Sequence, residues 1–195
     1  MIYPASLHDI RPFASYHSSA LSSVAFAVSG KLGVIGDYAF QQTALTSIII
    51  PASVNSIGAY AFRGCTSLTT VTFAAGSLLG TIEAEAFRDS TITSIAIPAS
   101  VTTIGNNAFM NCGSLTTVTF AAGIQLATIE SGVFQESGLT SIEIPSSVNS
   151  IGAYAFYQCS DLASVTFAAS STLGTIGGYA FQQTALTSII IPASV

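Results

Sequence analysis

The sequence has very little charge and no tryptophan. Only 7% of its 195 residues are charged, against roughly 25% in an ordinary soluble domain. Its net charge is −5 with only four Lys and Arg side chains, so we expect no nucleic-acid partner, because binding to phosphates needs clustered cations. No transmembrane segment is expected either, because Pro, Gly and polar residues interrupt the chain before about 18 apolar residues accumulate.

The N-terminal residues, from Met1 onward, also show no targeting signal. The first residues contain no basic start followed by an apolar segment, so no secretory signal peptide is visible. No acceptor sequence for N-glycosylation occurs either. Composition therefore gives no location for the protein.

Proline instead shows an internal repeat. Five of the six prolines follow one another at intervals of 47 residues: Pro4, Pro51, Pro98, Pro145 and Pro192. Each interval holds two similar segments of alternating length, 23 and 24 residues. Type A segments (residues 45–67, 92–114 and 139–161) carry the Pro and a Cys. Type B segments (21–44, 68–91, 115–138 and 162–185) carry two extra turn residues and, in the last three, Phe-Ala-Ala. Such regular repetition predicts a solenoid of about eight coils.

The type A segment that begins at residue 45 shows how one coil is expected to fold. Its apolar run predicts a strand with Ile48 and Ile50 facing inward and Ser47 and Ile49 facing outward. Pro51 ends this strand, since proline has no N–H for a sheet. A second short extended piece is expected at residues 54–58, and one turn of α- or 3₁₀-helix is expected at residues 59–62, with a glycine at position 58 permitting the turn.

Stacked coils place equivalent side chains in columns. Two columns of phenylalanine are predicted to form the core, which leaves no aromatic platform for a ligand: Phe40, Phe62, Phe87, Phe109, Phe134, Phe156 and Phe181 in the first, and Phe26, Phe73, Phe120 and Phe167 in the second. Residues 1–20 fit a degenerate first coil, and residues 186–195 fit an incomplete last coil. The whole chain, 1–195, is thus expected to be one repeat domain.

The pattern L-x-x-I-x-I-P-x-S-V-x-x-I-G-x-x-A-F-x-x-C, matched throughout by residues 139–161, resembles the BspA-like (Treponema pallidum-type) leucine-rich repeat. The resemblance covers essentially the whole chain. It implies an α/β solenoid with a parallel β-sheet on the concave side and short helical or 3₁₀ turns opposite. It also implies a surface or secreted protein, because family members are typically surface proteins of bacteria and protists and some are adhesins for host proteins.

The Cys, His and Asp residues, which often form disulfides or metal sites in proteins, are expected to have structural or solvent-exposed roles in this chain. Cys65, Cys112 and Cys159 lie on alternate coils, about 9–10 Å apart, which is too far for a disulfide or one shared zinc ion. We expect them to be small buried thiols. His8, Asp9 and His17 are expected to be exposed polar residues of the first coil, because their spacing in irregular chain defines no metal geometry.

The acidic residues are expected to be scattered and solvated around the turns of the type B coils: Glu83, Glu85, Asp89, Glu130 and Glu136. A glycosidase would need two carboxylates that face each other across a cleft. The sequence contains no G-x-S-x-G motif and no phosphate-binding loop. We therefore expect no enzyme activity, no metal and no cofactor.

The outward faces of the strands are the remaining candidate site. They form two columns of mostly small, uncharged residues: Ser47, Thr70, Ser94, Thr117, Ser141 and Ser164 in the first, and Ile49, Thr72, Ala96, Thr119, Glu143 and Thr166 in the second. One hypothesis is a contact surface for another protein. The other is that Ser and Thr only solvate the face of a sheet, in which Thr is favoured anyway.

Three functions follow from these patterns. The first is a non-catalytic protein-interaction module of an adhesin-like surface protein, which binds through the strand faces. The second is a structural spacer or fibre segment, with end-to-end self-association at the C-terminal end. The third is an ice-binding face, suggested by the T-x-T pairs of the type B strands, although the type A strands break that array.

Overall fold

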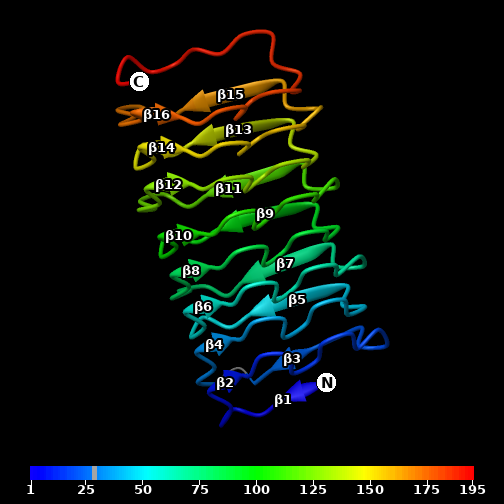
Figure 1. Cartoon of the computed structure of the whole chain (residues 1–195). Helices are drawn as coiled ribbons and strands as arrows, with labels where there is room; N and C mark the ends of the chain where they lie inside the picture. Colours follow the sequence, from blue (N-terminus) through cyan, green and yellow to red (C-terminus); the bar gives the residue numbers. More distant parts are fainter. Residues whose placement is uncertain (28–29) are drawn as a thin grey trace.

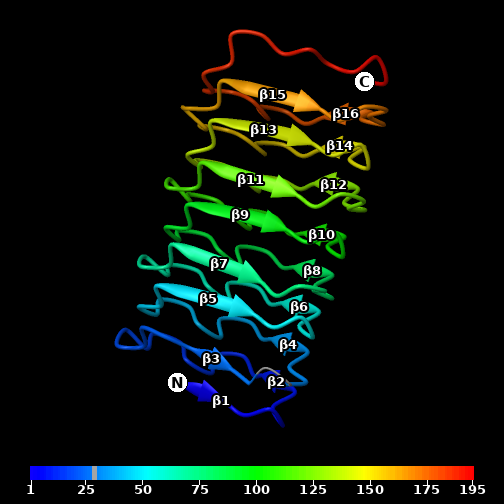
Figure 2. The same cartoon turned by 180° about the vertical axis from the view of Figure 1, so that it is seen from behind.

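Each of the eight coils before residue 186 makes two strands, the first of which has four residues from β5 onward, and the coils stack along a single axis. A computed structural model describes residues 1–27 and 30–195. The N-terminus lies at one end of the stack and the C-terminus at the other (Figures 1 and 2). The chain is therefore a parallel β-solenoid, as the 47-residue repeat predicts.

The first strand of each coil follows the apolar run. These strands are β1 (Ile2–Tyr3), β3 (Ala25–Phe26), β5 (Ser47–Ile50), β7 (Thr70–Phe73), β9 (Ser94–Ile97), β11 (Thr117–Phe120), β13 (Ser141–Ile144) and β15 (Ser164–Phe167). The second strand has two residues and precedes the turn. These strands are β2 (Asp9–Ile10), β4 (Val34–Ile35), β6 (Ser56–Ile57), β8 (Thr81–Ile82), β10 (Thr103–Ile104), β12 (Thr128–Ile129), β14 (Ser150–Ile151) and β16 (Thr175–Ile176).

All strand pairs are parallel, and every pair joins equivalent strands of adjacent coils, in five sheets. The long strands form the orders β1-β3, β11-β9-β7-β5 and β13-β15, and the short strands form β10-β8-β6-β4-β2 and β12-β14-β16. Ser47 pairs with Thr70 and Ile50 pairs with Phe73, so the type A and type B strands meet residue for residue. This register produces the columns expected from the sequence.

Side-chain directions along the long strands also agree with the prediction. In β5, Ile48 and Ile50 are buried, whereas Ser47 and Ile49 are exposed. The same alternation recurs in β9 and β13. Burial of the inward residues removes apolar surface from water, which stabilises the stack by roughly 25 cal/mol for each Å².

The helical turn predicted opposite the sheet is wrong, because the described residues contain no helix. Residues 58–65 instead form successive turns whose N–H groups alternate between two kinds of acceptor. Ala61 N and Arg63 N donate to the carbonyls of Gly58 and Tyr60 within the coil, at 3.3 and 3.1 Å. Phe62 N donates to the next coil, to Ala86 O at 2.7 Å.

Coil spacing explains this preference. An α-helix is about 10–12 Å wide with its side chains, whereas strands in a sheet lie about 4.8 Å apart. A helix in every coil would force the coils apart on that side. The ladder of turns keeps the spacing of the strands and also satisfies the backbone N–H groups between coils.

Two columns of left-handed backbone run along this turn side, with φ between 54° and 66° at every position. The first left-handed column lies two residues before the buried phenylalanine (Ser15 in the first coil) and contains Phe13, Tyr38, Tyr60, Glu85, Asn107, Gly132, Tyr154 and Tyr179. The second lies two residues after it and contains His17, Gln42, Gly64, Asp89, Asn111, Glu136, Gln158 and Gln183. A left-handed third residue is typical of a type II turn.

Gly58 plays a different role from the one expected. Its φ is not positive, so left-handed backbone does not require a glycine here. A Cβ at this position would instead lie 2.6 Å from the backbone nitrogen of Asp37 in the preceding coil. The glycine therefore permits the close approach of two coils rather than the turn itself.

The first phenylalanine column forms the core, as predicted, except that its last member, Phe181, is partly exposed. Phe40, Phe62, Phe87, Phe109, Phe134 and Phe156 are completely buried. Neighbouring rings from Phe40 to Phe181 stack nearly parallel, with centroids 5.1–5.7 Å apart. The prediction for the second column needs a correction: Phe26, Phe73, Phe120 and Phe167 pack against the core but stay partly exposed. Loop shape, which the repeat period does not specify, decides this.

Candidate binding surface

The strand face, defined as the twelve outward residues of β5, β7, β9, β11, β13 and β15, is open to solvent. All twelve residues of the two columns expected from the sequence are exposed. Ile49 has 64% of its surface accessible. Glu143 is the one charged residue among the twelve. The structure thus brings these residues together into one face, and whether this face binds a partner stays a prediction.

A neighbouring column of threonines shows that only some of the exposed hydroxyl groups are free to donate a hydrogen bond to a partner. The Oγ1 atoms of Thr69, Thr93 and Thr116 donate to carbonyl oxygens of the preceding coil, at 3.2–3.4 Å. Sequence analysis missed this column, whose signal is a Thr directly after the first Leu or Ile of most coils. Within the described parts of the chain, the strand-face hydroxyls make no such bond, so they remain able to donate to a partner.

Beside the strand face, the surface is hollowed where the long strands end. One depression, of about 380 Å³, is lined by the Pro98 turn and by the type B loops that follow β7 and β11. A second, of about 810 Å³, is lined by the Pro145 turn and by the loops that follow β11 and β15. Each depression thus lies over a type A turn, between the longer loops of the two adjacent type B coils.

The three thiols are buried and free, as predicted. The Cys112 Sγ donates to the carbonyl oxygen of Phe87 at 3.2 Å and lies 3.4 Å from Ser90 Oγ. Burial raises the pKa of Cys112 to about 11, because the apolar surroundings disfavour the thiolate. Cys65 and Cys159 make equivalent contacts with Thr43 and Ser137. Type B coils therefore carry a hydroxyl where type A coils carry a thiol, an alternation that sequence analysis missed.

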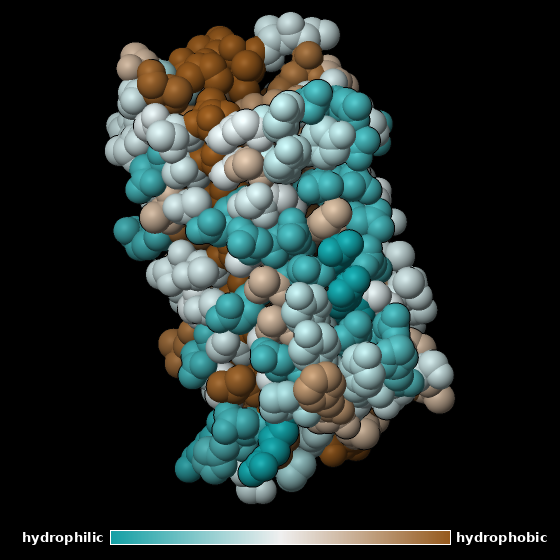
Figure 3. All heavy atoms as spheres, in the orientation of Figure 1, coloured by the Kyte–Doolittle hydropathy of each residue, from teal (hydrophilic) through white to brown (hydrophobic). Residues whose placement is uncertain are grey.

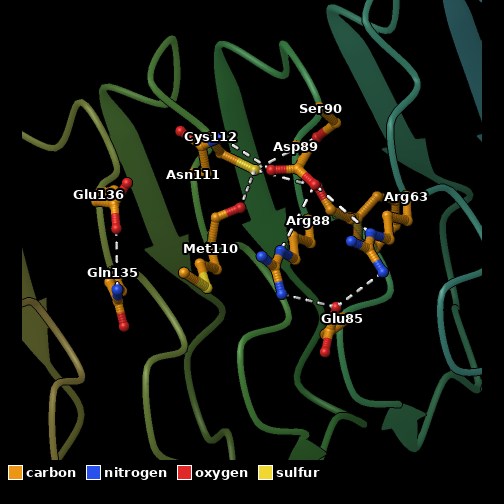
Figure 4. Close-up of polar contacts among 11 residues, drawn as sticks. Arg63, Glu85, Arg88, Asp89, Ser90, Met110, Asn111, Cys112, Gln135 and Glu136 are labelled. Carbon is orange, nitrogen blue, oxygen red and sulfur yellow. Dashed lines mark hydrogen bonds and ion pairs between the residues drawn. The ribbon is translucent and has the colours of Figure 1, made fainter.

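Charged residues on the turn side are less scattered than expected. Figure 4 shows Arg63, Glu85, Arg88 and Asp89, from two neighbouring coils, in one group. Glu85 Oε2 lies 3.4 Å from Arg63 and 3.0 Å from Arg88, and Asp89 Oδ2 lies 3.5 Å from the Nε atoms of both arginines. Asn111 extends the group by donating to Asp89 at 2.8 Å. The four side chains are only partly exposed, and ion pairs near the surface contribute about 1 kcal/mol or less each, so this group links two neighbouring coils.

Tyr60 lies beside this group. The Arg63 guanidinium lies over its ring, with Cζ 5.6 Å from the ring centroid. The ring also stacks on that of Tyr38, with the two centroids 4.6 Å apart. The negative charge of Glu85 raises the pKa of the Tyr60 hydroxyl, and burial adds to this effect. Because its faces are covered, this ring is not available to stack on a ligand.

The other candidate ligands lie apart. His8, Asp9 and His17 are exposed in the first coil. Among the residues that the structure describes, no three His, Cys, Asp or Glu side chains gather as a metal ion requires. Across residues 1–27 and 30–195, no helix has the length and apolar character needed to cross a membrane.

Apolar surface gathers at the C-terminal end of the stack (Figure 3). Ile191 is 38% exposed, whereas its equivalents Ile50, Ile97 and Ile144 are completely buried by the next coil. The last coil, from Leu186 onward, has an uncovered upper side.

A strand, a Pro-x-Ser turn and a buried Phe follow one another in every type A coil, and this order is the feature to compare with known repeat families. A family model for the BspA type leucine-rich repeat region matches six copies, over residues 1–79, 33–125 and 80–195. The chain belongs to this family. No curated protein matches it in sequence.

Solved structures of bacterial proteins, several of them leucine-rich repeat proteins, resemble the chain. The pneumococcal vaccine antigen PcpA is 26% identical, with a TM-score of 0.73 over 100% of this chain and 51% of that one. A leucine-rich repeat protein from Bacteroides ovatus is 31% identical, with a TM-score of 0.64 over 84% of this chain and 48% of that one. A leucine rich cell surface protein from Faecalibacterium prausnitzii is 25% identical, with a TM-score of 0.50 over 100% of this chain and 67% of that one. The chain spans about half the length of the first two.

Proposed function

We propose that this chain is a non-catalytic protein-binding module of a bacterial surface protein, and that it contacts its partner through the strand face. The observation that carries the proposal is the row of exposed, internally unbonded hydroxyls on six consecutive rigid strands. Such an array offers many hydrogen bonds with little side-chain entropy to lose, because Ser and Thr are short.

The chemistry of the face supports a protein partner rather than a polyanion. Glu143 is its one charge, so long-range attraction to charged molecules is weak there. Ile49 adds an apolar contact among the hydroxyls. Surface location is part of the proposal, and it is supported by the pneumococcal antigen and the cell surface protein that share the fold.

Binding of purified host extracellular proteins to the immobilised chain tests the proposal. Replacing Ser94, Thr117 and Ser141 together by Lys places three long charged side chains on the strand face. We expect binding of the partner to weaken by about 100-fold or more, which corresponds to about 3 kcal/mol.

A matched variant controls for added charge. Lys at Asn55, Thr102 and Asn149 adds the same three charges at exposed positions beside the short strands. This variant should bind like the wild type. Equal binding by wild type, strand-face variant and control would contradict the proposed role of the strand face.

A further inference from the structure

The two depressions border the strand face and share Ala96, Thr119 and Glu143 with it, but most of their lining lies in the turns and loops beyond the strands. They lie over the Pro98 and Pro145 turns and share one wall, the loop after β11, with Phe120 and Ala121 lining both. Phe73 lines the first depression as well. Both rings are partly exposed, unlike the buried column of the core. Each depression therefore offers an aromatic edge and a proline beside small residues.

Charge restricts what these depressions accept. Neither is lined by a Lys or Arg side chain, and Glu143 lines the Pro145 depression. An acidic ligand would meet this carboxylate without any compensating cation. A segment that is neutral or basic, with a Lys or Arg near Glu143, is complementary.

Spacing restricts the conformation of the ligand. The depressions are two coils apart, which is about 9.6 Å at the usual strand separation. A polyproline II helix rises about 9.3 Å in its three-residue turn, so every third side chain points the same way and reaches successive depressions. An extended β-strand alternates its side chains, so residues three apart point to opposite sides. Such a strand would fill only every second depression.

We propose that the Pro98 and Pro145 depressions bind a proline-rich, basic segment of a partner protein in the polyproline II conformation, with prolines three residues apart in the two depressions. Aromatic-lined grooves are the usual receptors for this conformation, which is preformed and loses little entropy on binding. The inference rests on the proposed function, since it names a class of protein partner for a site next to the strand face.

A synthetic peptide of about twelve residues, built from Pro-Pro-Arg triplets, is the probe. Its control contains Ala-Ala-Arg triplets, which carry the same charge without a preformed polyproline II helix. Titrations followed by NMR of the alanine methyl groups measure affinity and location together. We expect the proline peptide to bind about tenfold more tightly, with the largest shifts at Ala99 and Ala121.

Two variants with equal charge test the location. Ala121 is exposed and lines both depressions, whereas Ala127 is exposed in the same coil and lines neither. Ala121→Arg should weaken binding of the proline peptide about tenfold, and Ala127→Arg should leave it unchanged. Glu143→Gln should weaken it about two- to fivefold, as expected for one exposed ion pair.

Equal affinities for the two peptides, or equal effects of Ala121→Arg and Ala127→Arg, would overturn the inference. The Ser94, Thr117 and Ser141 side chains lie outside both depressions. The triple Lys variant should therefore still bind the proline peptide while losing the protein partner. Loss of peptide binding in this variant would place the peptide on the strand face and also overturn the inference.

Discussion

At the scale of single residues, the left-handed positions are the most unusual feature of the chain. On the turn side, two residues in each coil before residue 186 adopt positive φ, and most of them are Tyr, Gln, Glu, Asp or Asn rather than Gly. Left-handed backbone costs a non-glycine residue roughly 1–2 kcal/mol. Hydrogen bonds to the adjacent coil offset this cost: Gln158 N, for example, donates to Gln182 O at 3.0 Å.

Glycine should relieve this strain. Gln158 has a φ of 57°, is exposed and precedes a buried cysteine. Gln158→Gly is expected to stabilise the fold by about 0.5 kcal/mol, because the relief exceeds the entropy that glycine loses on folding. Gln158→Ala keeps the strain and should change stability little. Guanidinium unfolding midpoints measure both, and a Gly variant less stable than the Ala variant would contradict the account.

The buried thiols make stability depend on alkaline pH. The native state holds Cys112 protonated up to about pH 11, whereas an unfolded chain releases this proton at the ordinary value of 9.0. The stability is therefore fully present below pH 9 and is lost as the pH rises towards 11, by about 3 kcal/mol at most.

Thermal unfolding at pH 8 and pH 10.5 measures this loss. Cys112→Ala removes the titrating group, so its melting temperature should fall less over the same range than that of the wild type. The native thiols should also resist alkylation at pH 8 and react after unfolding. A rapid reaction of the folded protein would show that the thiols are accessible.

At the scale of elements, the strands were predictable and the turns were not. Ile48 and Ile50 alternate with Ser47 and Ile49, and this period of two is intrinsic to a strand. Residues 59–62 carry no equivalent signal, because the N–H groups of Tyr60 and Phe62 bond to the next coil. Their conformation depends on contacts between residues more than 20 positions apart, which local sequence does not express.

The candidate site shows the same division. The exposure of the strand face follows from alternation along each strand and could be predicted for all twelve residues. The partial exposure of Phe120 could not, because it depends on how the loops of two type B coils flank one type A turn. The sequence signal was the two extra residues in those loops.

The thermal stability of the chain should depend more on the alternation of the two coil types than on the number of coils. Removing residues 92–138 deletes one complete unit and rejoins a type B coil to a type A coil, as in the intact chain. Removing residues 92–114 instead stacks two type B coils, so that Ser90 meets Ser137 without a thiol between them. We expect the second deletion to lower the melting temperature by about 5–10 °C relative to the first.

Thermal unfolding by circular dichroism compares the two shortened chains. The larger deletion removes more of the core, so a simple dependence on length predicts the opposite order of stability. A melting temperature that falls in proportion to the residues removed would show that coil type is irrelevant.

At the scale of the whole molecule, each coil contacts only its neighbours, so the ends differ from the middle. The last coil exposes the apolar side chains of Ile190 and Ile191, and exposed apolar surface favours contact with another chain. We expect this chain to self-associate weakly through that end, which is also what the spacer alternative requires. A wholly monomeric chain would remove support for that alternative.

Sedimentation equilibrium over a range of concentrations measures this association. The average mass of the wild type should rise with concentration, and Ile191→Lys should reduce the rise because a charge replaces the apolar contact. Ile49→Lys is the matched control, since Ile49 lies on the strand face far from the end. Similar masses for all three chains would place the contact elsewhere or exclude it.

The identity of two distant stretches has a genetic consequence. Residues 38–54 and 179–195 have the same sequence and lie three 47-residue units apart. If the corresponding DNA is also alike, recombination between the two copies would insert or excise whole units. Because every junction between coil types would be one that already exists, such an event would change the length of the solenoid by three units, about 29 Å, and leave its fold intact.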